Sequence, residues 1–384
     1  MKCLINGTIV LKDRLMTESM IVFDDVIREI VPADATRTDL EYIDAKGRLI
    51  APGLIDVHSH GCVGEDATTS DAEGIRKMCQ SVATDGVTSW LPTLMTYPLE
   101  SLGASFDMLR DLRTESQGDP AAWNGAEILG VNMEGPFISK AKKGAHLEEY
   151  IIPPDADFVL SYADLIRLIT IAPELEGAMD LIKKLTATTE TRVAVGHTAI
   201  GYEEALEAFD AGVTEVTHLF NAMNGIHHRN PGLVGAALTR KDVYCELIAD
   251  TFHINKGLFQ LVADCKKDRL VLITDSMRAA GLPDGDYDLG GQQVHKEGIH
   301  CLLADGTIAG SVLRLNQAVY NLYTYTDLSL PEAVACASLH PAQAIGVDAR
   351  KGSIEVGKDA DLILIDEDLH IYRTMMRGVT IYEQ

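Results

Sequence analysis

Two histidines separated by one residue, His58 and His60, end an apolar run of the chain and form a candidate metal site. The apolar residues before them predict a buried strand, and alternate side chains of a strand point to the same side. Both imidazoles would therefore face one ion, and a neutral imidazole is the commonest metal ligand in proteins. The alternative is that one of them is a surface or core histidine and that the spacing is accidental. Residues further along the chain decide between these interpretations.

Four more ionisable residues stand where later predicted strands end. They are Glu134, His197, His218 and Asp275. In a parallel barrel such strand ends meet on one face, where active sites are built. Buried imidazoles and carboxylates without partners cost free energy, so a shared metal is the best explanation of their convergence. Any one of them alone could equally be a loop cap or a turn residue, so the argument rests on all six.

These residue types would hold one or two divalent ions. With zinc as the example, Glu134, His197 and His218 would leave a fourth position for water, which is the open arrangement that catalysis needs. Glu134 would also reach a second ion held by the first histidine pair. Asp275, if it is not a ligand, is the candidate base that takes a proton from this water and passes it to a leaving group.

From residue 51 to about residue 310, predicted strands alternate with helical stretches. These elements would position the six ionisable residues. Apolar runs typical of strands occur at residues 54–57, 87–94, 128–133, 165–171, 193–195, 215–217, 245–249 and 270–274. Their number, about eight, is that of a closed barrel. The predicted fold class is therefore α/β, with a (β/α)8 TIM-like barrel.

Both ends of the chain have a different pattern. Short β-prone runs between turn residues fill residues 1–50, and the chain is β-prone again after Gly352. We expect residues 1–50 and 350–384 to form one small β-sandwich domain, and residues 51–349 to form the barrel. A segment rich in Gly and Asp, residues 281–310, predicts hairpins inserted before the last helices.

Composition limits the partners and the compartment. The 384 residues include 33 basic and 57 acidic ones, a net charge of −24 that disfavours nucleic acid and anionic membranes as partners. Seven cysteines without a Cys-x-x-Cys pair suit reduced thiols in the cytoplasm better than disulfides. Cys62, beside the histidine pair, is either a further ligand or a small buried hydrophobe. We recognise no targeting or membrane-spanning segment, so we expect a cytoplasmic protein.

Several motifs resemble those of known enzymes. Residues 52–61 (PGLIDVHSHG) and 351–362 (KGSIEVGKDADL) resemble the opening and closing motifs of the amidohydrolase superfamily. Within it, further blocks resemble the N-acetylglucosamine-6-phosphate deacetylase family, and the likeness spans nearly the whole chain. These blocks are MEGPF at 133–137 with KGAH at 143–146, GHT at 196–198, THLFNAM at 217–223 and TDSM at 274–277.

The resemblance implies a role for each block. Glu134, His197 and His218 would be metal ligands, and Asp275 the general base and later the general acid. Some members of the family lack the histidine pair that this sequence keeps, so one or two ions per subunit are implied. The ion would be zinc, with iron, cobalt or manganese as alternatives.

The same resemblance implies how the substrate is held. His146, next to Ala145, would polarise the acetyl carbonyl, and Ile308 would line the acetyl pocket. The remaining substrate-binding residues would hold the sugar phosphate: Asn221, Ala222, Arg229 and His253. Arg229 would come from the neighbouring subunit, which implies a homodimer. Its guanidinium suits bidentate phosphate recognition, although it could also be a solvated loop charge.

The implied reaction is the deacetylation of N-acetyl-D-glucosamine 6-phosphate to D-glucosamine 6-phosphate and acetate by metal-activated water, in amino-sugar catabolism. Two alternatives stay open. One is another metal-dependent amidohydrolase, which acts on a cyclic amide or on a different N-acyl sugar. The other is a catalytically dead member that serves as an oligomeric scaffold.

Overall fold

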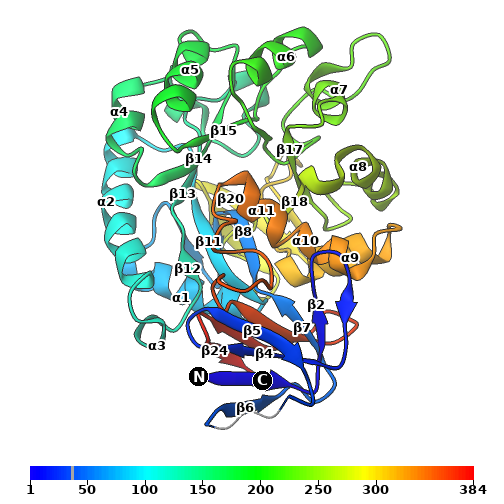
Figure 1. The fold of residues 1–384 in the computed structure, drawn as a ribbon. Coiled ribbons are helices and arrows are strands. Elements are labelled where there is room, and N and C mark those ends of the chain that lie inside the picture. Colours follow the sequence, from blue (N-terminus) through cyan, green and yellow to red (C-terminus); the bar gives the residue numbers. More distant parts are fainter. Residues whose placement is uncertain (36–38) are drawn as a thin grey trace.

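The chain folds into a barrel of parallel strands surrounded by helices, with two smaller sheets beside it, in the computed structural model of Figure 1. The structure describes residues 1–35 and 39–384. In that part of the chain, parallel strands follow one another around the barrel in chain order: β8 (Leu54–Ser59), β11 (Val87–Leu94), β13 (Val131–Glu134), β14 (Ile166–Ile171), β15 (Arg192–Val195), β16 (Glu215–Val216), β17 (Tyr244–Ile248) and β18 (Leu270–Ile273). The predicted (β/α)8 fold class is confirmed.

The barrel closes between its first and last strands, next to the histidine pair. β8 pairs with β11, and parallel pairing continues to β18. Two residues beyond β18, the backbone N–H of Asp275 donates to the carbonyl of His58 at 2.8 Å. Every residue of β8, β11 and β18 is buried, as expected for parallel strands that helices cover from outside. The apolar runs of the sequence thus correspond to the barrel wall.

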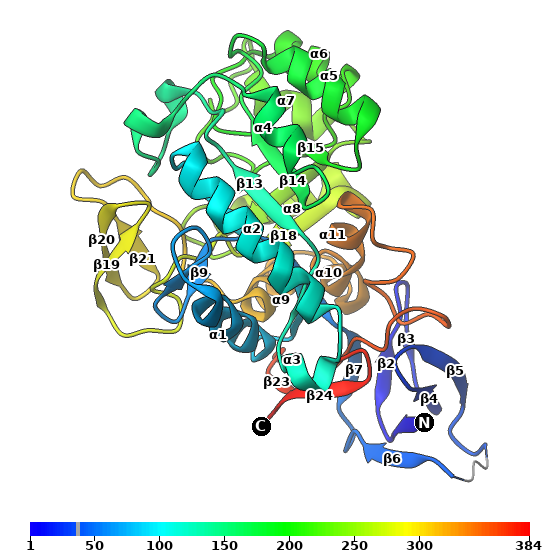
Figure 2. The same ribbon diagram turned by 90° about the vertical axis from the view of Figure 1, so that its left-hand side faces the viewer.

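Helices pack around the barrel (Figure 2), and their apolar side chains point inward. In α1 the residues spaced for a helical face, such as Ile75, Met78 and Val82, are buried. The α-helices of the described residues are α1 (Ala72–Ala83), α2 (Leu99–Ser116), α3 (Pro120–Trp123), α4 (Ala156–Ser161), α5 (Ala178–Thr188), α6 (Tyr202–Asp210), α7 (Gly232–Thr239), α8 (Phe259–Lys266), α9 (Leu315–Thr324), α10 (Leu330–Ala335) and α11 (Leu339–Ala344). Short 3₁₀ turns are η1 (Lys140–Lys142), η2 (Glu148–Tyr150), η3 (Lys256–Leu258) and η4 (Lys267–Arg269).

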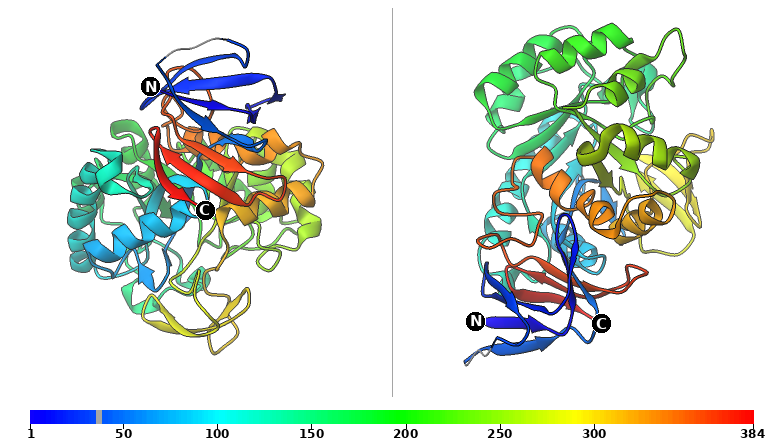
Figure 3. Two further views of the ribbon diagram at one scale, coloured as in Figure 1. Left: turned by 90° about the horizontal axis from the view of Figure 1, so that it is seen from below. Right: turned by 45° about the vertical axis from the view of Figure 1, so that its right-hand side comes forward.

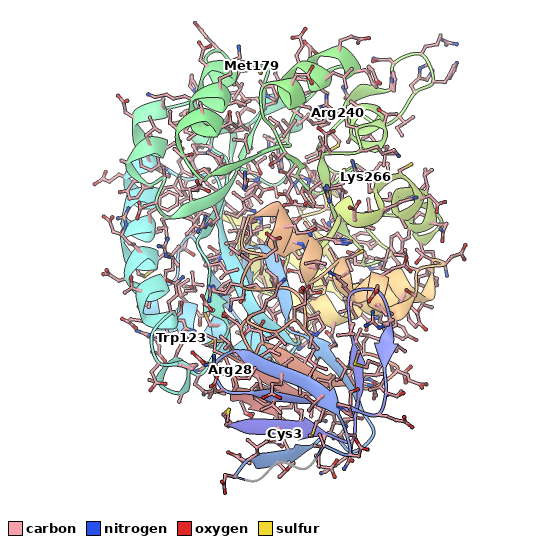
Figure 4. The ribbon with its side chains drawn as sticks, in the orientation of Figure 1. Cys3, Arg28, Trp123, Met179, Arg240 and Lys266 are labelled. Atoms are coloured by element: carbon pink, nitrogen blue, oxygen red, sulfur yellow. The ribbon has the colours of Figure 1, made fainter. Side chains whose placement is uncertain are left out.

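One buried ammonium group joins the helices that follow β16 and β17. Lys266, labelled with Arg240 in Figure 4, donates from Nζ to the carbonyls of Ala237 and Arg240 at 2.8 and 2.7 Å. The last carbonyls of a helix have no partners within it. Lys266 supplies those partners at the end of α7, so it links α7 to α8.

Both chain ends build the smaller sheets, which lie side by side in Figure 3. A four-stranded sheet has the order β5 (Ile27–Pro32), β4 (Ser19–Phe23), β1 (Lys2–Ile5), β6 (Glu41–Asp44). A six-stranded sheet has the order β24 (Val379–Glu383), β23 (Ile371–Met376), β22 (Leu362–Ile365), β7 (Leu49–Pro52), β2 (Thr8–Val10), β3 (Leu15–Met16). Phe23, Ile50 and Leu362 share one apolar core between them. The predicted β-sandwich from both chain ends is confirmed.

A cluster of buried charges links this sandwich to the barrel. Lys351 donates to Glu127 at 2.7 Å and to Asp361 at 2.7 Å, and it lies 2.9 Å from Asp359. Glu127 begins the short strand β12 (Glu127–Ile128), which pairs with β11 of the barrel. Because the sheets of both chain ends share a core of their own, we propose residues 1–50 with 350–384 as one domain and residues 51–349 as the other.

A three-stranded antiparallel sheet rises from the rim of the barrel, where hairpins were predicted (Figure 2). It consists of β19 (Gly285–Leu289), β20 (Gln292–Glu297) and β21 (His300–Leu302). Leu289 of this sheet packs in one apolar cluster with Met95 and Ala145. A second small hairpin, β9 (Gly61–Cys62) with β10 (Glu65–Asp66), follows the histidine pair. Across residues 1–35 and 39–384, no helix is long and apolar enough to cross a membrane.

Candidate metal centre and active site

The six ionisable residues singled out by the sequence meet at the carboxyl ends of the barrel strands. Glu134 is the last residue of β13, and His58 and His60 stand at the end of β8. The other three lie two residues beyond their strands in a left-handed backbone conformation, with φ of 48° at His197, 27° at His218 and 49° at Asp275. Residues other than glycine seldom adopt this conformation, and such strain is kept mainly at functional sites.

Three of these residues surround one point. Glu134 Oε1 lies 3.1 Å from His197 Nε2 and 2.9 Å from His218 Nε2. The two imidazole nitrogens are 3.0 Å apart. Ligands bound to one tetrahedral zinc ion at 2.0–2.2 Å lie about 3.3 Å from one another. Glu134, His197 and His218 are therefore within reach of a single ion.

A second group lies against the first and shares Glu134 with it. His60 Nε2 is 3.1 Å from Glu134 Oε2 and 3.2 Å from Asp275 Oδ1. His58 Nε2 is 3.4 Å from Glu134 Oε1 and 3.7 Å from Asp275 Oδ1. His58, His60 and Asp275 could hold a metal ion together. Glu134 stands between the two groups, where a carboxylate would bridge two ions.

The hydrogen bonds of the histidines fit a metal better than they fit a protein network. His60 Nδ1 donates to the carbonyl of Thr93 at 3.1 Å, and His197 Nδ1 donates to that of Lys142 at 2.8 Å. His58 Nδ1 donates to the carboxylate of Glu246 at 2.9 Å. Each ring therefore directs Nε2 into the site, which is the orientation of a metal ligand. Among the described residues, His58 Nε2 is buried and has no hydrogen-bond partner.

Charge also favours a cation at this point. Burial alone would lower the pKa of His60, but hydrogen bonds to Asp275 and Glu134 raise it to about 10. Burial likewise opposes ionisation of Asp275, yet the hydrogen bond with His60 and the charge of His58 lower its pKa to about 2. The carboxylates thus draw positive charge into the site. A divalent ion would take the place of these protons.

His146 differs from the other imidazoles. Its Nδ1 accepts the backbone N–H of Thr96 at 3.3 Å and lies 2.7 Å from the hydroxyl of that threonine. Burial lowers the pKa of His146 to about 4, so the ring is neutral. Its proton is therefore on Nε2, which lies 3.3 Å from Glu134 Oε2. Although His146 lies close enough to be a ligand, this tautomer makes it a hydrogen-bond donor at the edge of the metal centre.

The site opens into a pocket of about 370 Å³. Met95, Ala145 and Leu289 form an apolar wall. The other predicted substrate residues that line the pocket are His146, Asn221, Ala222, His253 and Ile308. His253 is fixed by Asp250, whose carboxylate lies 2.6 Å from its Nδ1.

Two residues from the sequence prediction lie apart from this pocket. Arg229 is exposed on a loop, where its guanidinium contacts His228 at 2.8 Å, and it does not line the pocket of its own chain. Cys62 is buried, and burial raises the pKa of its thiol to about 12. A neutral thiol is a poor metal ligand, so of the two interpretations of Cys62 we retain the small buried hydrophobe.

Sequence reasoning missed the residues that hold these side chains. Thr93 and Thr96 act through a backbone carbonyl and a backbone N–H, which no residue type reveals. The sequence could have indicated Glu246, because it is a carboxylate inside the otherwise apolar strand β17. A buried charge in such a strand needs a partner, and here the partner is His58.

A (β/α)8 barrel whose strand ends gather two carboxylates and four imidazoles around one or two ion positions defines a metal-dependent hydrolase. The sequence pattern of the Amidohydrolase family matches residues 49–381. The chain therefore belongs to the amidohydrolase family, as its first and last motifs indicated, and this family implies a divalent metal.

Within the amidohydrolase family, the following comparisons show that the chain is similar to deacetylases of N-acetylated sugar phosphates. The chain is 38% identical to the N-acetylgalactosamine-6-phosphate deacetylase of Escherichia coli O157:H7, over 95% of this chain and 97% of that protein. It is 37% identical to the N-acetylglucosamine-6-phosphate deacetylase of Bacillus subtilis (strain 168), over 86% and 84%. The crystal structure of N-acetylglucosamine-6-phosphate deacetylase from Pasteurella multocida superposes with a TM-score of 0.92 at 30% identity and covers 99% of both chains. The resemblance noted in the sequence is confirmed.

Proposed function

We propose that this chain hydrolyses the acetamide group of N-acetyl-D-glucosamine 6-phosphate, in amino-sugar catabolism. The products are acetate and D-glucosamine 6-phosphate. The observation that carries the proposal is the meeting of Glu134, His197 and His218 around one point at the bottom of a pocket, in a chain related to sugar-phosphate deacetylases.

A divalent ion is part of this proposal. We take zinc as the ion and two ions per chain, because zinc suits imidazole and carboxylate ligands. Glu134 with His197 and His218 would hold one ion, and His58 and His60 beside Glu134 would hold the other. This assignment leaves Asp275 as the base. When bound, the ions would polarise the acyl carbonyl and make water a better nucleophile.

The side chains of this chain move the protons. Asp275, ionised at neutral pH, takes a proton from the attacking water. His146 donates from Nε2 to the acyl oxygen, where negative charge develops as the water oxygen bonds to carbon. Asp275 then returns the proton to the amide nitrogen as the C–N bond breaks. The amine and acetic acid leave, and the acid loses its remaining proton to the amine or to solvent, which gives acetate. Asp275 is then ionised again, and His146 keeps its proton on Nε2.

The sugar phosphate would be held by the polar lining of the pocket. His253, fixed by Asp250, and Asn221 face it from one chain. We propose that Arg229 completes the phosphate site in a homodimer, where it would reach the pocket of the neighbouring subunit. The support is its position: it is exposed and outside the pocket of its own chain. Guanidinium groups suit such bidentate contacts with phosphate.

We also propose a cytoplasmic location. No disulfide joins the cysteines within residues 1–35 and 39–384, and six of the seven are buried. Free thiols persist in a reducing compartment, whereas exported proteins tend to pair them.

Acetate release tests the function directly. Purified protein loaded with zinc should release acetate from N-acetylglucosamine 6-phosphate, at least tenfold faster than from the sugar without phosphate, and chelation should abolish the release. N-acetylgalactosamine 6-phosphate belongs in the same assay, because a relative named for that substrate is 38% identical. If neither phosphorylated sugar yields acetate while a cyclic amide is opened, the function belongs to another branch of the family. Stable metal binding without any turnover would favour a scaffold.

A further inference from the structure

Glu246 contacts both halves of the metal centre from inside the barrel. It lies in β17, is fully buried, and uses one oxygen, Oε2, for two hydrogen bonds. This oxygen accepts Nδ1–H of His58 at 2.9 Å and the backbone N–H of His218 at 2.9 Å. His58 belongs to one ligand group and His218 to the other. One carboxylate oxygen therefore links ligands that are far apart in the sequence.

We infer that Glu246 is a positioning residue that holds His58 as a ligand of the second ion and keeps it in register with His218. The inference rests on the proposed metal-dependent function. It concerns how the centre is assembled, which neither the motifs nor the relatives specify.

The bond to His58 determines which nitrogen faces the ion. An ionised carboxylate only accepts hydrogen bonds, so the proton of the neutral ring must be on Nδ1. Nε2 is then left with its lone pair, and it points toward Glu134 and Asp275, 3.4 and 3.7 Å away. A carboxylate behind a ligating imidazole also makes the ring a stronger ligand.

The bond to His218 acts on the backbone. His218 has a φ of 27°, which is costly for a residue with a side chain. Its N–H would be buried without a partner if Glu246 were absent, and a buried donor without a partner destabilises the fold. Glu246 thus stabilises the turn that brings His218 Nε2 to 2.9 Å from Glu134.

Glu215 offers a matched control in the neighbouring strand. It lies in β16, and like Glu246 it is fully buried. Neither of its carboxylate oxygens has a hydrogen-bond partner within residues 1–35 and 39–384, so it holds no ligand. Burial and the nearby charge of Glu246 hold the pKa of Glu215 well above its ordinary value, which favours the uncharged carboxyl. Glu215→Gln therefore changes little, whereas Glu246→Gln removes a charge behind His58.

The test measures zinc bound per chain and its affinity in full-length Glu246→Gln, Glu215→Gln and wild-type protein. Each is stripped, reloaded and titrated with a competing chelator. We expect two ions in the wild type and in Glu215→Gln. In Glu246→Gln one ion should bind about 10–100-fold more weakly, as for other carboxylates behind a ligating histidine. The other ion should change less, because the glutamine oxygen can still accept the N–H of His218.

A second comparison shows that the effect passes through His58. In a His58→Ala background, Glu246→Gln should not weaken zinc binding further, because the imidazole that it supports is gone. A purely structural role would lower both affinities in either background. If Glu246→Gln does not fold, Glu246→Asp is used instead, because it withdraws the carboxylate by one methylene. Glu215→Asp is then the control.

Two results would overturn the inference: unchanged affinity for both ions in Glu246→Gln, or a wild-type chain that never binds a second ion. Failure of the proposed function looks different. In that case the wild type would bind two ions, Glu246→Gln would weaken one, and no acetate would be released from either phosphorylated sugar.

Discussion

The chain contains two buried clusters of charge that are built in opposite ways. At the junction of barrel and sandwich, Glu127, Asp359 and Asp361 are all within 2.9 Å of Lys351 Nζ. At the strand ends, Glu134 and Asp275 are surrounded by imidazoles, and within the described residues they form ion pairs with histidines but with no lysine or arginine.

The difference shows what each cluster is for. Lysine and arginine are permanently charged at neutral pH, so the junction is complete without any ligand. Imidazoles are neutral once their Nε2 atoms bind a metal, so the strand-end cluster needs an ion to balance its carboxylates. Changes at the junction should therefore alter stability, and changes at the strand ends should alter metal binding and turnover.

The largest effect should come from the strand ends. Asp275→Asn keeps the shape of the side chain but removes the carboxylate that we propose accepts a proton from water. We expect the rate of acetate release to fall by about 10²–10⁴-fold, the usual contribution of a general base. The melting temperature should stay within a few degrees of the wild type, and the ion near Glu134, His197 and His218 should remain. A rate close to that of the wild type would remove Asp275 from the mechanism.

The junction should respond in the opposite sense. Lys351→Met fills a similar volume but leaves three carboxylates without their shared cation. Breaking a buried ion pair in this way costs about 3–5 kcal/mol, so chemical denaturation should show a lower free energy of unfolding. Zinc bound per folded chain and acetate release at a permissive temperature should match the wild type. A loss of metal in folded Lys351→Met would mean that the two clusters are not separate.

The junction should also show a defined pH dependence. Burial would raise the pKa of Glu127, but the charges of Lys351 and Arg350 and their hydrogen bonds lower it to about 2. A carboxyl with a lowered pKa stabilises the fold above its unfolded pKa of about 4.5, and the stabilisation is lost as the pH falls toward 2. The wild type should thus be about 3 kcal/mol more stable than Glu127→Gln at pH 7. Denaturation at pH 7, 5 and 3.5 should show this gap shrinking at pH 3.5, and a constant gap would contradict it.

The smallest effect should come from the residue behind His146. Thr96→Val keeps the backbone N–H that His146 Nδ1 accepts but removes the hydroxyl 2.7 Å from it. Loss of one such hydrogen bond is worth about 1 kcal/mol, so acetate release should fall less than tenfold and zinc content should not change. Thr88→Val, in the barrel wall away from His146, serves as the control. If Thr96→Val loses zinc, this result would instead indicate that His146 is a metal ligand in the wild type.

Much of this arrangement was predictable from the sequence. Apolar runs that end in His58, Glu134 and Asp275 indicated both the barrel strands and the face on which they converge. The pairing of both chain ends followed from their β-prone runs. These features are local: a strand and its final residue are adjacent in the chain.

The rest depends on distant contacts. The tautomers of His60 and His146 are set by backbone groups of Thr93 and Thr96, and residue types do not encode these contacts. The left-handed backbone at His218 is stabilised by Glu246, which lies on the next strand. Leu289 lines the pocket from an inserted sheet. The hydrophobic pattern of the sequence predicts its hairpins but not where they pack. A sequence can thus indicate which residues gather, but not what holds each ring in place.

One measurement tests the contrast between the clusters most directly: anomalous diffraction at the zinc edge from crystals of the zinc-loaded protein. We predict a strong peak in contact with Glu134, His197 and His218, with a second beside His58 and His60, and none at Lys351. No peak between Glu134, His197 and His218, or a zinc ion at the junction, would contradict the account.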